Sequence, residues 1–235
     1  MPDASHVAWE AASRIATALR GAVERNNHAT FALSGGNTPR AAYARLAREP
    51  GIDWTKVDIF WVDERAAPAT DDRSNYRWAK VTLLDGAQIG EGSVHRMPAD
   101  QPDLEAAAQA YERTIREQVH GNGDGVPAFD ALVLGVGDDG HTASLFPGDS
   151  TLGVVDRLVA AVPAGEGREA RLTLTPTAIE HARSVYVLAV GRAKRPAVER
   201  VWADEGLLSQ TPARLIRRCR GQVTWIVDQD LRPVG

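Results

Sequence analysis

Residues 132–148 read LVLGVGDDGHTASLFPG and join a glycine-rich turn to an acidic pair and a histidine. The glycines at positions 135, 137 and 140 have the Gly-x-Gly-x-x-Gly spacing of dinucleotide-binding turns. In such a site the last glycine opens a long helix, and an acidic residue follows about 20 positions later, after the next strand. Here Pro147 interrupts the chain seven residues after Gly140, and Asp156 precedes the next apolar run. We therefore expect no dinucleotide site, and no cofactor.

The same turn carries groups that can move protons. The imidazole of His141 can act as a general base and then as a general acid, because an imidazole titrates near neutral pH. Asp139, two residues earlier, could fix the tautomer and orientation of the ring. We expect His141 and Asp139 to be catalytic, although a histidine that only caps the turn or packs in the core would have the same spacing.

Other catalytic classes lack their signatures. No serine lies in a Gly-x-Ser-x-Gly turn, which argues against an acyl-serine hydrolase. The six histidines include no His-x3-His pair, so we expect no metal site. The single cysteine, Cys219, permits no internal disulfide, and we expect it to be a core or surface residue.

Groups suited to an anion follow several apolar runs. Residues 34–38 combine two glycines with the expected start of a helix, where Thr38 would be the N-cap and free N–H groups would favour a phosphate. A tight turn without a ligand would have the same residues. The acidic pair 63–64 could accept hydrogen bonds from sugar hydroxyls, orient a catalytic group or form structural ion pairs. The candidate substrate- and phosphate-binding residues are Ser34, Gly35, Gly36, Asn37, Thr38, Asp63, Arg65, Arg171 and Lys194.

Apolar periodicity indicates alternating helices and strands. Helices are expected within residues 1–25, from about 38, around 76–84, and over 103–120 and 195–203. The expected strands are ATFAL, VDIFWV, FDALVLGVG, RLVAAVP, RLTLT, SVYVLAVG and VTWIVD. This order predicts an α/β fold with a mainly parallel sheet flanked by helices, built as one domain over residues 1–235 with room for a small subdomain.

Four of the polar stretches should meet in that fold. Ligands of open parallel sheets bind beyond the carboxyl ends of the strands. SGGNTPR, DER, GVGDDGH and GRAK each follow an expected strand, so we expect them to line one site. Residues 163–170, PAGEGREA, are the best candidate for a mobile loop, and whether they close over a substrate stays open.

Bulk composition excludes several classes of protein. The 235 residues are 43% hydrophobic and carry a formal net charge of −4, which argues against a nucleic-acid partner or a membrane surface. No basic, apolar leader opens the chain, and no apolar stretch of about 18 residues occurs. We expect a soluble, cytoplasmic protein, and we favour a monomer.

Taken together, LSGGNTPR, VDER followed by DDRSNY, GVGDDGHTASLFPG, and RLTLT followed by GRAK resemble the 6-phosphogluconolactonases in order and spacing. The resemblance runs over nearly the whole chain, and DGHTASLFPG is its most specific part. It implies a modified Rossmann-like fold and hydrolysis of 6-phospho-D-glucono-1,5-lactone to 6-phospho-D-gluconate, with His141 as the base that activates water. One departure is Asp138, since the family usually has an uncharged residue there. Its carboxylate could make His141 more basic or point to solvent, and we expect it to point to solvent.

Two alternatives compete with this interpretation. A glucosamine-6-phosphate deaminase on the same fold would resemble DGHIAFNEP, but its proton-transferring glutamate falls on Phe146 here. A non-catalytic sugar-phosphate sensor would ordinarily carry a DNA-binding module, and the first expected strand begins by about Thr30, which leaves room for one helix only. A free-standing sensor remains an alternative.

Overall fold

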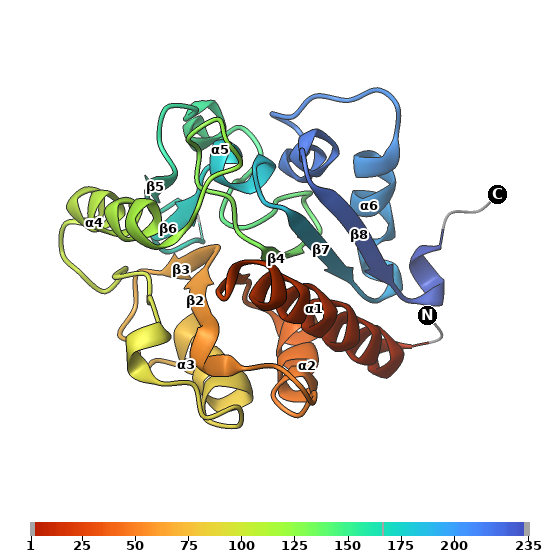
Figure 1. The fold of residues 1–235 in the computed structure, drawn as a ribbon. Coiled ribbons are helices and arrows are strands. Elements are labelled where there is room, and N and C mark those ends of the chain that lie inside the picture. Colours follow the sequence, from red (N-terminus) through yellow and green to blue (C-terminus); the bar gives the residue numbers. More distant parts are fainter. Residues whose placement is uncertain (1–2, 166, 233–235) are drawn as a thin grey trace.

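Five parallel strands form the main sheet of the protein. In this computed structural model, which describes residues 3–165 and 167–232, the strand order is β2-β1-β4-β7-β8 (Figure 1). These strands are β1 (Ala29–Leu33), β2 (Val57–Trp61), β4 (Ala131–Gly135), β7 (Ser184–Ala189) and β8 (Gln222–Val227). Their pairings are all parallel, so their carboxyl ends share one edge of the sheet. The expected α/β class with a mainly parallel sheet is confirmed.

A small antiparallel sheet adjoins the first, with strands in the order β3-β6-β5. Its strands are β3 (Asp63–Arg65), β5 (Val159–Val162) and β6 (Arg171–Leu174). Val62 links the two sheets, because its N–H donates to Leu33 and its carbonyl accepts from Leu174. The DER stretch was expected as the end of a strand. It instead forms β3, and this places Arg65 opposite Arg171.

Helices cover both sheets. They are α1 (Ala4–Asn26), α2 (Asn37–Leu46), α3 (Asn75–Ala79), α4 (Leu104–Gln118), α5 (Pro176–Glu180) and α6 (Arg195–Trp202). Figure 1 shows α1 lying beside α2 and α4 lying along the small sheet. At the other edge, α6 packs on β8 through Trp202 and Trp225, whose rings are 5.2 Å apart.

Local sequence explains where these helices begin. Asp3 caps α1 by accepting the N–H of His6, and Asp103 caps α4 by accepting the N–H of Ala106. The expected apolar face of α1 is buried, with Ile15 and Leu19 fully inside the core. Apolar periodicity therefore located both helices correctly to within a few residues.

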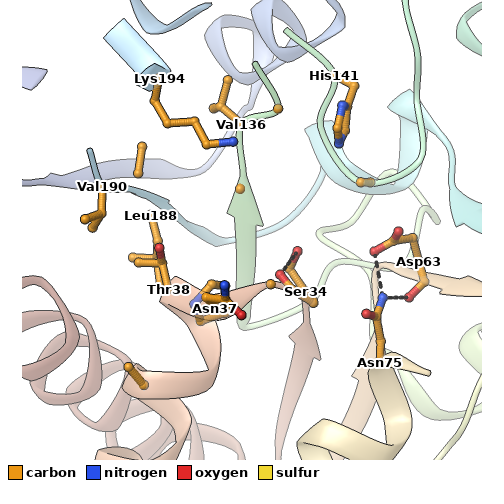
Figure 2. Close-up of a pocket in the computed structure, with 18 of the residues that line it drawn as sticks. Ser34, Asn37, Thr38, Asp63, Asn75, Val136, His141, Leu188, Val190 and Lys194 are labelled. Carbon is orange, nitrogen blue, oxygen red and sulfur yellow. Dashed lines mark hydrogen bonds between the residues drawn. The ribbon is translucent and has the colours of Figure 1, made fainter. Parts of the chain in front are cut away.

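The start of α2 differs from expectation. Gly36, not Thr38, is the N-cap residue, with a φ of 107° that favours glycine, and no side chain caps the helix. The first backbone N–H groups of α2 therefore point from an uncapped end toward whatever lies in front of it. This end faces the carboxyl edge of the main sheet (Figure 2).

The core lies between the main sheet and its helices. Its largest fully buried side chains include Phe31, Phe60, Trp61, Phe129 and Met97. Within the described residues, no helix is long and apolar enough to cross a membrane.

Candidate active site

A cavity of about 560 Å³ lies beyond the carboxyl ends of β1, β4 and β7. Every residue expected to bind substrate or phosphate lines it, and so does His141. Asp139 does not line the cavity but contacts His141. Figure 2 shows Lys194 and the start of α2 on one side, with His141 and Asp63 on the other. The fold thus brings the four expected stretches together.

The histidine is held by its neighbouring carboxylate. Asp139 Oδ1 lies 2.6 Å from His141 Nδ1 and also accepts the His141 backbone N–H at 3.0 Å. Burial opposes ionisation of Asp139, but these hydrogen bonds and the charge of His141 outweigh it, so the pKa of Asp139 lies below its ordinary value. An ionised carboxylate only accepts hydrogen bonds, so in the neutral ring Nδ1 carries the proton and Nε2 has a lone pair. That lone pair is the base the site offers.

The glycines shape the turn that carries His141. A Cβ at Gly137 would lie 2.1 Å from His141 Nδ1, so only glycine leaves room for the ring. Gly140 has a φ of 92°, a conformation that side chains strongly disfavour. Residues 141–149 continue as turns and short bridges, so Gly140 does not open a helix here.

Phe146 packs against the histidine. The two rings are 4.8 Å apart, and the guanidinium of Arg168 lies 3.9 Å from the Phe146 centroid. Arg168 also pairs with Asp149 at 3.0 Å. The loop 163–170 is therefore anchored to the catalytic turn through Arg168, while its residue 166 lies outside the described residues. Sequence reasoning missed this contact, because a Phe and an Arg 22 positions apart carry no shared pattern.

One side of the cavity combines the uncapped end of α2 with Lys194. Lys194 Nζ lies 2.9 Å from Asp138 Oδ1, and the Asp138 side chain is 70% exposed. Asp138 is thus largely exposed to solvent, as expected, and its carboxylate also lies within reach of a cation of the cavity.

A second charged cluster joins the small sheet to the turn that carries His141. Ser144 Oγ donates to Asp63 Oδ2 at 2.7 Å, and Arg171 lies 3.7 Å from the same oxygen. Burial lowers the pKa of Arg171, but an arginine stays charged at neutral pH because its ordinary pKa is so high. Asp63 therefore offsets part of the positive charge of Arg171. Ser144, fully buried, was not singled out from the sequence.

Glu64 organises the loop beside the cavity and is not free to bind a sugar. Its carboxylate accepts the backbone N–H groups of Arg65, Asn75 and Tyr76, each at 2.8 Å, and the hydroxyl of Ser74 at 3.0 Å. Burial raises the pKa of Glu64. Of the alternatives for the acidic pair, a contact of Glu64 with substrate hydroxyls does not fit the structure, because the side chain is buried and its oxygens are engaged within the protein.

Asn75 is a site residue that sequence reasoning missed. Its Nδ2 donates to the Asp63 carbonyl at 2.9 Å, and its buried Oδ1 has no partner among the described residues. A Cβ at Gly35 would lie 1.9 Å from that oxygen, so Asn75 can hold this position only with a glycine at position 35. The only signal in the sequence was the polar run DDRSNY after DER.

Metal ligands do not gather in the part of the chain that the structure describes. No group of three or more His, Cys, Asp or Glu side chains there could hold a metal ion.

Several known proteins are similar to this chain in sequence and in fold. Residues 2–225 match the family model described as Glucosamine-6-phosphate isomerases/6-phosphogluconolactonase. A Synechocystis protein named 6-phosphogluconolactonase is 40% identical over 223 residues, which cover 93% of this chain and 91% of that protein. The Trypanosoma brucei 6-phosphogluconolactonase structure superposes with a TM-score of 0.85 at 28% identity, covering 98% of this chain and 95% of the other.

A monomeric glucosamine-6-phosphate deaminase has the same fold, with a TM-score of 0.81 at 20% identity over 99% of this chain and 98% of the other. The family model, the curated relatives and the solved structures therefore agree over almost the full chain. This chain belongs to the glucosamine-6-phosphate isomerase/6-phosphogluconolactonase family.

Proposed function

We propose that the protein hydrolyses 6-phospho-D-glucono-1,5-lactone to 6-phospho-D-gluconate, the second step of the oxidative pentose phosphate pathway, in the cytoplasm. One observation carries the proposal. A single cavity holds a carboxylate-oriented histidine on one side and an uncapped helix start with a lysine on the other. This arrangement suits a substrate with an electrophilic carbon at one end and a phosphate at the other.

The chemistry requires little beyond a positioned base. His141 Nε2 takes a proton from water, and the resulting hydroxide forms a bond to C1 of the lactone. Backbone N–H groups near the glycine turns stabilise the negative charge that develops on the carbonyl oxygen. The bond from C1 to the ring oxygen then breaks, and protonated His141 returns its proton to that oxygen. A lactone carbonyl is already electrophilic, so no covalent intermediate with the protein is needed.

Phe146 favours this hydrolysis over sugar-phosphate isomerisation. Its ring lies against His141, where the deaminase motif would place a proton-transferring glutamate. A phenyl ring can neither donate nor accept the proton that ring opening and isomerisation require. The site therefore keeps one base and lacks the second acid of the alternative reaction.

The decisive test is a coupled assay with freshly generated lactone, corrected for spontaneous hydrolysis. We expect His141→Ala to lower kcat by about 10²–10⁴-fold, the range for loss of a general base. His120→Ala is the matched control, because that exposed histidine contacts His28 and lies outside the cavity. Circular dichroism and the urea midpoint should show that both variants are folded.

Two results would contradict the proposal in different ways. Wild-type activity in His141→Ala would remove the base assignment. A wild-type protein without lactonase activity would remove the function, and release of ammonia from glucosamine 6-phosphate would then support the deaminase alternative.

A further inference from the structure

Lys194, the lysine of the cavity, already has an anionic partner from the protein itself. Its Nζ lies 2.9 Å from Asp138 Oδ1. Lys194 ends the short helical turn Arg192–Lys194 after β7, whereas Asp138 belongs to the turn after β4. The ion pair therefore spans two neighbouring strands at the edge of the sheet where the phosphate is proposed to bind.

The pair is positioned well but held weakly. Arg200 donates to the Asp138 carbonyl at 3.2 Å, and Gly137 and Gly140 close the turn on either side. The side chains of Lys194 and Asp138 remain 32% and 70% exposed. Exposed ion pairs stabilise a fold only weakly, so an incoming anion can replace the carboxylate at little cost.

Charge decides which anions can do so. A phosphate monoester carries about −1.5 to −2 at pH 7, more than the single negative charge of a carboxylate. The attraction between Lys194 and a dianion is stronger than the attraction between Lys194 and Asp138 that it replaces. The dianion is stabilised further where it also reaches the free N–H groups of α2. A neutral sugar lactone carries no charge that could compete with Asp138 for Lys194, so the ion pair stays in place.

We propose that Asp138 is a specificity-determining residue that competes with the substrate phosphate for Lys194. This inference rests on the proposed function. Asp138 weakens the binding of every phosphorylated ligand, and it leaves unphosphorylated sugars facing a neutralised lysine. When the product leaves, the ion pair between Lys194 and Asp138 forms again. The position therefore sets how strongly phosphate is held, whereas its neighbour Asp139 orients the base.

Binding of inorganic phosphate and of 6-phosphogluconate, measured by titration calorimetry, tests the proposal without turnover. We expect Asp138→Asn to lower the Kd of both ligands by about 2–5-fold, the equivalent of an exposed ion pair. Lys194→Ala should raise both Kd values. The double variant should match Lys194→Ala, because without the lysine there is nothing for Asp138 to compete for.

A control and a second substrate sharpen the test. Asp85→Asn removes the same charge from another exposed lysine–aspartate pair, Lys80–Asp85, whose atoms are 2.6 Å apart outside the cavity, and should leave both Kd values unchanged. In kinetics, Asp138→Asn should lower KM for the phosphorylated lactone and not for D-glucono-1,5-lactone, which has no phosphate.

Three outcomes would overturn the inference. One is an unchanged phosphate Kd in Asp138→Asn. Another is the same gain in affinity in the Lys194→Ala background, which would indicate a general effect of charge. The third is a wild-type protein that binds neither ligand. A protein that binds phosphate as described but hydrolyses no lactone would refute the proposed function alone.

Discussion

At the residue scale, two adjacent aspartates take different partners. Asp139 contacts His141, and Asp138 contacts Lys194. The first contact could be predicted from the sequence, because only one residue separates the two groups within one turn. The second could not, because Lys194 is brought there by another strand. The same applies to Ser144 and Asp63, which are 81 positions apart.

The role of Asp139 predicts a loss of rate without a loss of binding. In Asp139→Asn, an amide can donate to Nδ1 and so shift the imidazole proton to Nε2, which removes the lone pair that activates water. We expect kcat to fall on the order of 10²-fold. KM should change little, because Asp139 does not line the cavity.

Steady-state kinetics of Asp139→Asn and Asp138→Asn, measured side by side, tests whether Asp139 acts on kcat and Asp138 on KM. The neighbouring variant removes the same charge one residue away and is expected to act on KM. A kcat equal to that of the wild type in Asp139→Asn would show that Asp139 does not orient the base.

At the element scale, the parallel strands explain why sequence reasoning found the site. Apolar runs located β1, β4 and β7, and their carboxyl ends share one edge of the sheet. The small sheet was harder to foresee. β3 has only three residues, and its partner β6 lies far along the chain, so no local periodicity reports the pairing. The cap of α2 was assigned wrongly because Thr38 fits the general preference, whereas the turn needs glycine at Gly36.

The contact between the β1–α2 turn and α3 predicts a defect at Gly35. In Gly35→Ala the new Cβ would meet Asn75 Oδ1 at 1.9 Å, so the buried asparagine must move. We expect a loss of about 1–3 kcal/mol in the free energy of unfolding, as for other overpacked sites, and a raised KM.

Urea denaturation and the lactone assay measure the two effects at Gly35. Adding Asn75→Ala removes the colliding oxygen, so the double variant should lose less stability than the sum of the single variants. Gly92→Ala is the control, because a Cβ there meets nothing within 4 Å. Additive losses would show that the two positions do not interact.

At the scale of the whole molecule, a protein with net charge −4 must attract an anionic substrate by local charge. Arg65, Arg171 and Lys194 supply it inside the cavity, while other ion pairs hold the fold. One of these joins neighbouring segments at the β2 edge of the sheet that are far apart in the sequence. Asp58 on β2 lies 2.8 Å from His28 Nε2 and 3.3 Å from His95 Nε2.

This arrangement predicts how stability depends on pH. Burial opposes ionisation of Asp58, but hydrogen bonds and charge from His95 and His28 outweigh it and lower the pKa of Asp58. A lowered native pKa means that the unfolded chain binds a proton first as the pH falls below about 4. The stabilisation from Asp58 is therefore fully present above that pH and is lost below it.

Urea unfolding across a pH series measures this contribution. The stability difference between wild type and Asp58→Asn should shrink as the pH falls from about 5 toward the native pKa of Asp58. Asp85→Asn, which removes an exposed carboxylate, should not change the slope of the wild-type profile. A difference that stays constant with pH would mean that Asp58 stabilises the protein by packing alone.

The adjacency of β1 and β4 has a consequence for how the protein folds. Asp130, just before β4, accepts hydrogen bonds from the backbone and hydroxyl of Thr30 on β1, across 100 residues of chain. Closing so long a loop is slow, because its entropy is lost before the contact is made. The helix start at Gly36, the turn of His141 and the lysine after β7 meet only when these strands have paired. In early folding species these residues are therefore still apart, because the site assembles only after the strands have paired. During refolding we expect activity to return after secondary structure has formed.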